Sequence, residues 1–409
     1  MTKLRFFQPG QRARAARGFT LVELMVSLVI GMGLIITMGL LSNKFETAKR
    51  ESASSSDMSS TSAFLSYDID RQIRSAGSGF STSWSDTYGC ELTASRNSAQ
   101  ALPAPAAFPE PFASVPQSIR MVPLVVYPVA AAASATGSDV IQVMTGTGGV
   151  GEVPNPLRTK SVATNIMRLT STVGIQADDL LLITDAGRPC MLEQVSASYT
   201  GTSDQVDLAG AYYAAVINGQ ALNDRATGAS YAKSFIVGNA TNNNPPRFNL
   251  LGVNASNQLV RYDLLNFGNG GASSTEPVPL ADGVMMMRVR YGIDSTGDGI
   301  IDSWVRPDAV NYTATDITTN QARARQVIAV KISMVLRSDT IEDQSSNTNQ
   351  STTRSTYFVA PPTLRLFSSL GSALQDTYTV ADRQRRHNVV EFTVPLRNVL
   401  ASVRTAIPS

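Results

Sequence analysis

An uncharged apolar run near the amino terminus constrains this chain more than any other feature. The run extends from Leu24 to Leu41 and contains no charged residue. Counted from Phe19, a helix here would measure about 35 Å at 1.5 Å per residue, enough to cross the hydrocarbon core of a bilayer. Glu23 stands at the start of the run, where a carboxylate is costly in lipid unless it has a dedicated partner. The sequence therefore predicts a membrane-spanning helix that begins beside a partnered acid.

The residues before the run carry positive charge and no acid, which favours a leader that stays in the cytoplasm. A secretory signal peptide would be cut after the apolar run at small residues, and residues 40–44 offer no such site. A plain single-span anchor remains an alternative, although it gives no reason for Glu23. The basic residues of the leader are Lys3, Arg5, Arg12, Arg14 and Arg17.

The order Arg-Gly-Phe-Thr-Leu-Val-Glu at residues 17–23 resembles the type IV prepilin signal. The resemblance implies that prepilin peptidase cleaves after Gly18 and that Phe19 becomes the N-methylated first residue. It also implies that Glu23 pairs with the amino terminus of a neighbouring subunit during assembly. On this interpretation residues 1–18 are the leader, and residues 19–41 are the transmembrane part of the helix in the inner membrane.

The helix is expected to continue beyond the membrane, with residues 42–77 as its periplasmic part. Leu65, Ile69 and Ile73 recur at helical spacing and predict a face that packs on a β-sheet. The serine-rich stretch 52–62 is the weak section, either a solvated helix face or a frayed one. Two glycines, Gly77 and Gly79, are predicted to end the helix.

Residues 78–409 are predicted to form a globular, β-rich head. Residues 82–156 contain many prolines and glycines and predict a loop-rich insertion. The alternation at residues 330–334 predicts a sheet with one face in water. The fold class is thus α+β, a long N-terminal hydrophobic and amphipathic helix packed on an antiparallel sheet, as in pilins. The predicted strands are 140–144, 180–184, 191–195, 234–237, 259–264, 284–291, 327–336 and 389–394.

Segments 287–294, 330–337 and 392–398, together with the serine-rich helix, narrow the resemblance to the PilW class of minor pilins. That class implies a subunit of the tip or initiation complex that primes type IV pilus assembly, with roles in adhesion and twitching motility. The implied partners are other minor pilins, the major pilin and a PilY-type tip adhesin. The head would be periplasmic first and would then lie at the pilus tip on the cell surface. A minor pseudopilin of type II secretion and a tip adhesin with its own ligand are the alternatives.

The chain has two cysteines, Cys90 and Cys190. A prepilin head is delivered to an oxidising compartment, where disulfides persist, so a bond between them is predicted. The pair lacks C-x-x-C spacing and is too sparse for a metal site.

Residues 294–302 match D-x-[DNST]-x-D-G-x-x-D, the first nine positions of a calcium loop. In a calcium loop Val305 would be a bidentate carboxylate, and Thr296 would be an acid or amide. A polar hairpin turn is therefore an equal alternative to a weak calcium site. The predicted ligands are Asp294, Thr296, Asp298, Ile300 through its carbonyl oxygen, and Asp302.

No pattern in the sequence favours an enzyme or a nucleic-acid-binding protein. His387 is the only histidine and falls in an arginine-rich stretch that predicts a solvated loop. Neither a nucleophile elbow nor a phosphate-binding loop is present. The formal charge of +2 becomes about −3 without the five basic leader residues, so no basic patch remains for nucleic acid.

Overall fold

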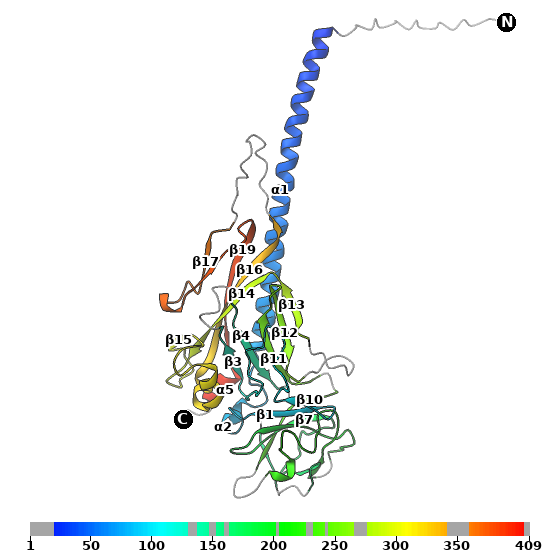
Figure 1. The fold of residues 1–409 in the computed structure, drawn as a ribbon, viewed down its shortest axis with the longest axis vertical. Coiled ribbons are helices and arrows are strands. Elements are labelled where there is room, and N and C mark those ends of the chain that lie inside the picture. The colour runs from blue at the N-terminus through cyan, green and yellow to red at the C-terminus, as the bar shows by residue number, and fades with distance from the viewer. Residues whose placement is uncertain are drawn as a thin grey trace, which may run out of the picture. The chain divides into compact units, whose positions relative to one another are not determined.

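The computed structural model describes a long helix and a β-rich head (Figure 1). Two compact units divide the chain, Met1–Ala53 with Glu342–Ser355, and Ser54–Ile341 with Thr356–Ser409. We call the second unit the head; it includes the last part of the helix. The described residues are 20–129, 137–146, 153–158, 163–201, 204–225, 232–241, 244–265, 276–341 and 360–404.

Helix α1 spans Leu21–Arg74 and remains helical through the serine-rich stretch. Its buried face recurs every three or four residues, as the apolar spacing predicts. Ser54 belongs to that face, and its hydroxyl lies 2.7 Å from the hydroxyl of Ser338. Gly77 follows the helix with φ +80°, a conformation that favours glycine. The buried residues of this face and the following turn are Ser54, Met58, Leu65, Ile69, Gln72, Ile73 and Ala76.

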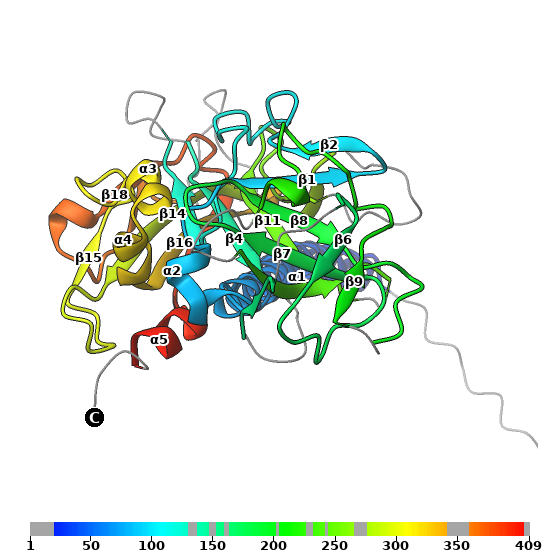
Figure 2. The same ribbon diagram turned by 90° about the horizontal axis from the view of Figure 1, so that it is seen from below.

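A five-stranded sheet packs beside the carboxy-terminal part of α1 (Figures 1 and 2). The amide of Asn249 donates to the Gln72 side chain at 3.3 Å, and the Ser75 hydroxyl lies 3.4 Å from that of Thr145. These contacts join α1 to the two strands at the centre of the sheet. Neighbouring strands are antiparallel, in the order β13 (Val278–Asp282), β12 (Gln258–Asp263), β11 (Arg247–Val253), β4 (Val140–Thr145) and β3 (Leu124–Tyr127).

A four-stranded antiparallel sheet contains the longest strands of the head. Its order is β15 (Ser303–Val305), β14 (Val284–Ile293), β16 (Val327–Ile341) and β19 (Arg385–Pro395). The prediction that one face would be in water holds in part at Lys331 and is wrong at Ser333. Ser333, expected on the wet face, is fully buried, because a hairpin of β17 (Thr363–Leu366) and β18 (Asp376–Thr379) contributes to a second apolar cluster with Met286 and Val335.

The six-stranded sheet departs from the predicted antiparallel pattern at one place among the described strands. Strands β1 and β8 are parallel, with Leu92 opposite Cys190. Parallel neighbours need a long crossover, and here the chain passes through two other sheets between them. The order is β2 (Ala99–Leu102), β1 (Leu92–Arg96), β8 (Cys190–Gln194), β7 (Asp179–Thr184), β10 (Lys233–Asn239) and β5 (Asn155–Pro156).

The stretch 82–156, predicted to be a loop-rich insertion, also contains strands β1 to β5. Strands β3 and β4 are buried and belong to the sheet beside α1, so this stretch is part of the core. Its prolines lie mainly between the strands and not within them. The alanine tract 130–133 lies outside the described residues. The remaining elements are α2 (Trp84–Thr87), α3 (Ala314–Thr319), α4 (Gln321–Gln326), α5 (Arg397–Arg404), β6 (Ile166–Arg168), β9 (Gln205–Asp207) and the 3₁₀ turns Ser81–Ser83, Leu222–Asp224 and Ser372–Leu374.

Candidate functional site

The amino-terminal end of α1 is closed by a reciprocal pair of side chains. The Glu23 amide donates to the Thr20 hydroxyl at 3.3 Å, and the Thr20 amide donates to the Glu23 carboxylate at 3.4 Å. The Thr20 hydroxyl also donates to that carboxylate at 3.3 Å. This Thr-x-x-Glu arrangement is a capping box, which satisfies backbone donors at a helix start. The predicted cleavage and methylation residues, Gly18 and Phe19, lie outside the described residues.

Glu23 lies at the start of a stretch of α1 whose large apolar side chains are exposed in the described chain. From Leu21 to Ser42 the mean hydropathy is 2.4 and none of the window is buried. Ile35 is 73% exposed and Leu34 is 56% exposed. This is the one described helix that is long and apolar enough to cross a membrane. The stretch therefore needs lipid or another protein around it.

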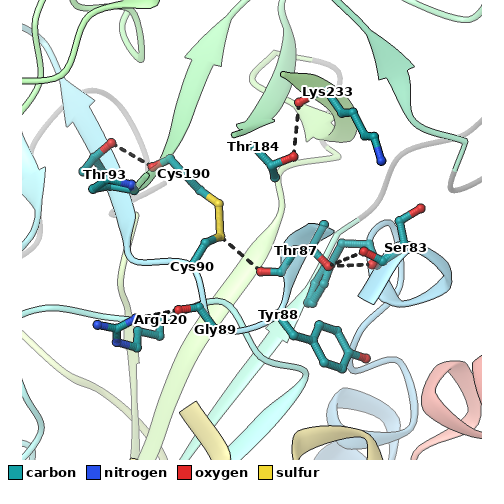
Figure 3. Close-up of a disulfide and its surroundings, with 12 residues drawn as sticks. Ser83, Thr87, Tyr88, Gly89, Cys90, Thr93, Arg120, Thr184, Cys190 and Lys233 are labelled. Atoms are coloured by element: carbon teal, nitrogen blue, oxygen red, sulfur yellow. Dashed lines mark hydrogen bonds between the residues drawn. A yellow bond between two sulfur atoms is a disulfide. The ribbon is translucent and has the colours of Figure 1, made fainter. Parts of the chain in front are cut away.

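The structure contains the predicted disulfide between Cys90 and Cys190, with 5.7 Å between their Cα atoms (Figure 3). Cys90 precedes β1 and Cys190 is the first residue of β8. The Thr93 hydroxyl donates to the Cys190 carbonyl at 2.8 Å, and the Arg120 guanidinium donates to the Gly89 carbonyl at 2.6 Å (Figure 3). The bond therefore lies at the beginning of the parallel pair.

In the predicted calcium loop, hydrogen bonds within the loop occupy the carboxylates. Gly297 and Gly299 donate their amides to the two oxygens of Asp294, the latter at 2.7 Å. Asp302 accepts from the Ser295 hydroxyl at 2.6 Å and from the Ser295 amide at 2.7 Å. These bonds, led by the hydroxyl, lower the pKa of Asp302. The loop's own amide and hydroxyl groups thus provide the hydrogen bonds of Asp294 and Asp302, and the loop forms a turn between β14 and β15.

Of the other predicted ligands, Thr296 contacts both acids as a hydrogen-bond donor, and Asp298 forms a separate bond within the loop. Asp298 accepts from the Ile300 amide at 2.8 Å, and the Ile300 side chain is 66% exposed. The Thr296 hydroxyl donates to Asp294 at 3.3 Å. Among the described residues, no three histidine, cysteine or acidic side chains are grouped as a metal site would require. Calcium binding stays a prediction.

Two family models match the chain. One, described as type IV pilus-assembly protein W, matches residues 234–398, from β10 through β19 into α5. The other, the prokaryotic N-terminal methylation motif, matches residues 13–41 and so includes Gly18, Phe19 and Glu23. Together, these two matches support a type IV pilin of the PilW type. Its N-terminal apolar helix and methylation motif fit membrane anchoring and a place in a pilus.

The search of solved structures matches a type IV-like pilin from Thermus thermophilus. The two chains are 16% identical, and the match covers 38% of this chain and 70% of that one with a TM-score of 0.20. A score this low adds nothing to the family models, which carry the assignment. No curated protein matches the chain.

Within the region of the PilW match, Arg290 and Arg306 form an arginine cluster around Asp376 that the sequence did not predict. Arg290 is 1% exposed and forms an ion pair with Asp376 on β18, to which Arg306 also donates at 2.8 Å. The Arg290 guanidinium lies 4.4 Å from the centre of the Phe367 ring. Burial opposes the charge on Asp376, but the two arginines outweigh it and hold its pKa below the usual value. The cluster fastens the β17–β18 hairpin to β14.

The only histidine of the chain is not in a solvated loop as predicted. His387 lies on β19, half-buried, with its ring 6.3 Å from that of Tyr378 and its Nδ1 2.9 Å from the Arg385 carbonyl oxygen. Desolvation lowers its pKa. The family match indicates a structural protein, and His387 packs as part of the sheet.

Proposed function

We propose that this PilW-type pilin is a minor pilin of the tip or initiation complex that primes type IV pilus assembly. Prepilin peptidase would cleave after Gly18, and Phe19 would be N-methylated. The head would be periplasmic while α1 crosses the inner membrane, and would later lie at the pilus tip. Its partners would be other minor pilins, the major pilin and a PilY-type tip adhesin, with consequences for adhesion and twitching motility.

The observation that carries the proposal is Glu23 at the start of an exposed apolar helix. The carboxylate accepts hydrogen bonds from Thr20, but the described residues supply it with no positive charge. In lipid an ionised carboxylate is stabilised by an opposite charge. A neighbouring subunit's N-terminal amine would supply that charge once cleavage has exposed it. The anchor would then be an assembly element and not only a membrane tether.

Cleavage is tested by the intact mass of the membrane protein. The expected mass is that of a chain that begins at Phe19 and carries one methyl group. Gly18→Val should leave the uncleaved chain, which still includes residues 1–18. The peptidase needs a small residue at the cut, because the substrate must approach its catalytic groups closely. A wild-type mass that retains Met1 to Gly18 would refute prepilin processing.

Position in the assembly is tested by deleting the gene and by immunogold labelling. Because an initiating complex acts at nucleation, deletion should reduce the number of surface pili while the major pilin stays stable in the membrane. Label should appear at pilus tips. Normal pili together with a defect in protein secretion would favour a type II pseudopilin instead. Normal pilus numbers with lost surface binding would favour a tip adhesin, and label along the whole shaft would contradict the tip placement.

A further inference from the structure

A cavity of about 390 Å³ lies between the end of α1 and strands β4 and β11 of the head. Arg71 lines it from the helix and Arg247 from β11. Hydroxyl groups of Ser75 and Thr145 also line it, and their 3.4 Å contact joins the two walls. The cavity therefore combines two guanidinium groups with hydroxyl groups on a fixed helix–sheet contact.

The charge in this cavity is unbalanced. No acid is among its described lining residues, and no described residue forms a hydrogen bond or ion pair with the guanidinium of Arg71 or Arg247. Asp68, one turn before Arg71 on α1, is already engaged by the Gln72 amide at 2.7 Å. Two exposed arginines on opposite walls favour a carboxylate, which guanidinium groups bind through paired, charge-assisted hydrogen bonds.

An aromatic flank of α1 leads to the cavity. Phe64 is 53% exposed and Tyr67 is 67% exposed. Positions 64, 67 and 71 lie on one side of a helix, because they are separated by three and four residues. Tyrosine and arginine dominate the binding energy of protein interfaces, and aromatic residues are enriched there. The surface is thus apolar at Phe64 and Tyr67 and becomes cationic where Arg71 enters the cavity lining.

We propose that this surface, Phe64, Tyr67, Arg71 and Arg247, docks a neighbouring pilin-class subunit. The partner segment presents one carboxylate to the two arginines and apolar side chains to the two aromatic rings. The proposal rests on the proposed function in pilus assembly. It adds a contact made by the head, separate from the Glu23 contact at the start of α1.

Site-specific photocross-linking of the full-length protein in its own cells tests the surface. The probe is p-benzoylphenylalanine in place of Tyr67, and the adduct is identified by mass spectrometry. We expect one adduct with a pilin-class chain, whose cross-linked peptide contains an aspartate or glutamate. The same probe at Val310, which is 84% exposed and far from the lining residues in sequence, controls for exposure and should give no such adduct.

Charge reversal decides whether the arginines recognise an acid. Arg71→Glu with Arg247→Glu should lower the adduct yield about tenfold, as expected for loss of a charged contact. Arg365→Glu reverses an exposed arginine outside the cavity and should change nothing. Because both target arginines are exposed, the variants should fold, and unchanged thermal unfolding checks this. Replacing the identified partner acid by lysine should restore the adduct.

No adduct at position 67, or an adduct with a chain outside the pilin class, would overturn the proposal. An unchanged yield in the double-arginine variant, or no restoration by the partner's lysine, would do the same. The intact mass and the pilus count test the proposed function separately. If the protein is processed and primes pili but gives no adduct at position 67, the docking surface is refuted and the proposed function stands.

Discussion

The two ends of α1 use the same kinds of side chain for different purposes. In the stretch from Leu21 to Ser42, large apolar residues are more than half exposed. In the stretch from Ser54 to Arg74, Leu65, Ile69 and Ile73 are at most 1% exposed. Both stretches are regular helix. What differs is burial. The head buries the apolar side chains of the second stretch, whereas those of the first stretch are exposed in the described chain.

This difference separates folding from assembly along one helix. Burial of apolar surface stabilises by about 25 cal/mol per Å², and the second stretch gains this within its own chain. The first stretch gains it only from lipid or from other subunits. Substitutions in the first stretch should therefore change assembly, and substitutions in the second should change the stability of the head.

The largest expected effect is on assembly, from Glu23→Ala. The variant should be cleaved and stable but should lose recruitment to other pilins, because the neighbour's amine loses its carboxylate. Co-purification from detergent extracts measures this. Asp57→Ala, which removes an exposed acid further along α1, is the matched control and should be recruited normally. Normal pili with Glu23→Ala would remove the proposed role, and a less stable head would break the comparison.

Asp376→Asn should cause the largest loss of stability in the head. It leaves Arg290 buried beside a neutral group, and breaking a buried ion pair costs about 3–5 kcal/mol. Denaturant unfolding of the detergent-solubilised protein measures the free energy. The matched control is Asp204→Asn, whose pair with Arg158 is exposed and should contribute about 0–1 kcal/mol.

The pH dependence of Asp376 follows from its lowered pKa. A lowered folded-state pKa gives stability above the unfolded value, about 3.9, and this stability is lost as the pH falls through the folded pKa. The difference in unfolding free energy between wild type and Asp376→Asn should thus shrink below about pH 4. A constant difference down to pH 2 would mean that the charge on Asp376 is not the cause.

Ile69→Ala and Leu28→Ala test the comparison directly. Deleting buried methyl groups at Ile69 should destabilise the head by about 2–5 kcal/mol. Leu28 is 57% exposed, so Leu28→Ala should leave head unfolding within about 0.5 kcal/mol of wild type. Thermal unfolding in one detergent compares the two. Equal losses would show that both stretches of α1 are coupled to the head.

The smallest expected effect is from calcium at the loop 294–302. The ion must displace amide and hydroxyl donors from Asp294 and Asp302, so binding should be weak. With a dissociation constant of about 1 mM, 10 mM calcium would stabilise the protein by about 1.4 kcal/mol. Calorimetric titration and thermal shift measure this, and Asp298→Ala should abolish it. No heat and no shift would leave the segment as a turn.

Local patterns predicted local structure well. Each predicted strand corresponds to an observed one, because β-branched runs between turn residues carry a strong signal. The other eleven described strands were not predicted. The longest of them is β11, in which Asn249 and Gly252 interrupt the apolar pattern. The assembly segment is recognisable because leader, glycine, glutamate and apolar run are consecutive residues.

Contacts between distant residues could not be predicted in this way. Arg290 alternates with apolar residues on β14 and so reads as a solvated position. Its burial depends on Asp376 and Phe367, which come from another part of the chain. Likewise, the serine pattern gave no sign that Ser54 is buried, because its partner Ser338 is 284 residues away.

The disulfide between Cys90 and Cys190 has a consequence for the folding of the head. Parallel strands cannot be joined by a tight turn, so the alignment of β1 with β8 must be found across most of a hundred residues. The chain offers only one way to pair two cysteines within a molecule, so oxidation cannot trap a rival internal bridge. Because the sulfur atoms bond where both strands begin, closure also selects the correct alignment. Oxidation thus fixes the alignment of the parallel pair β1 and β8 by a covalent bond.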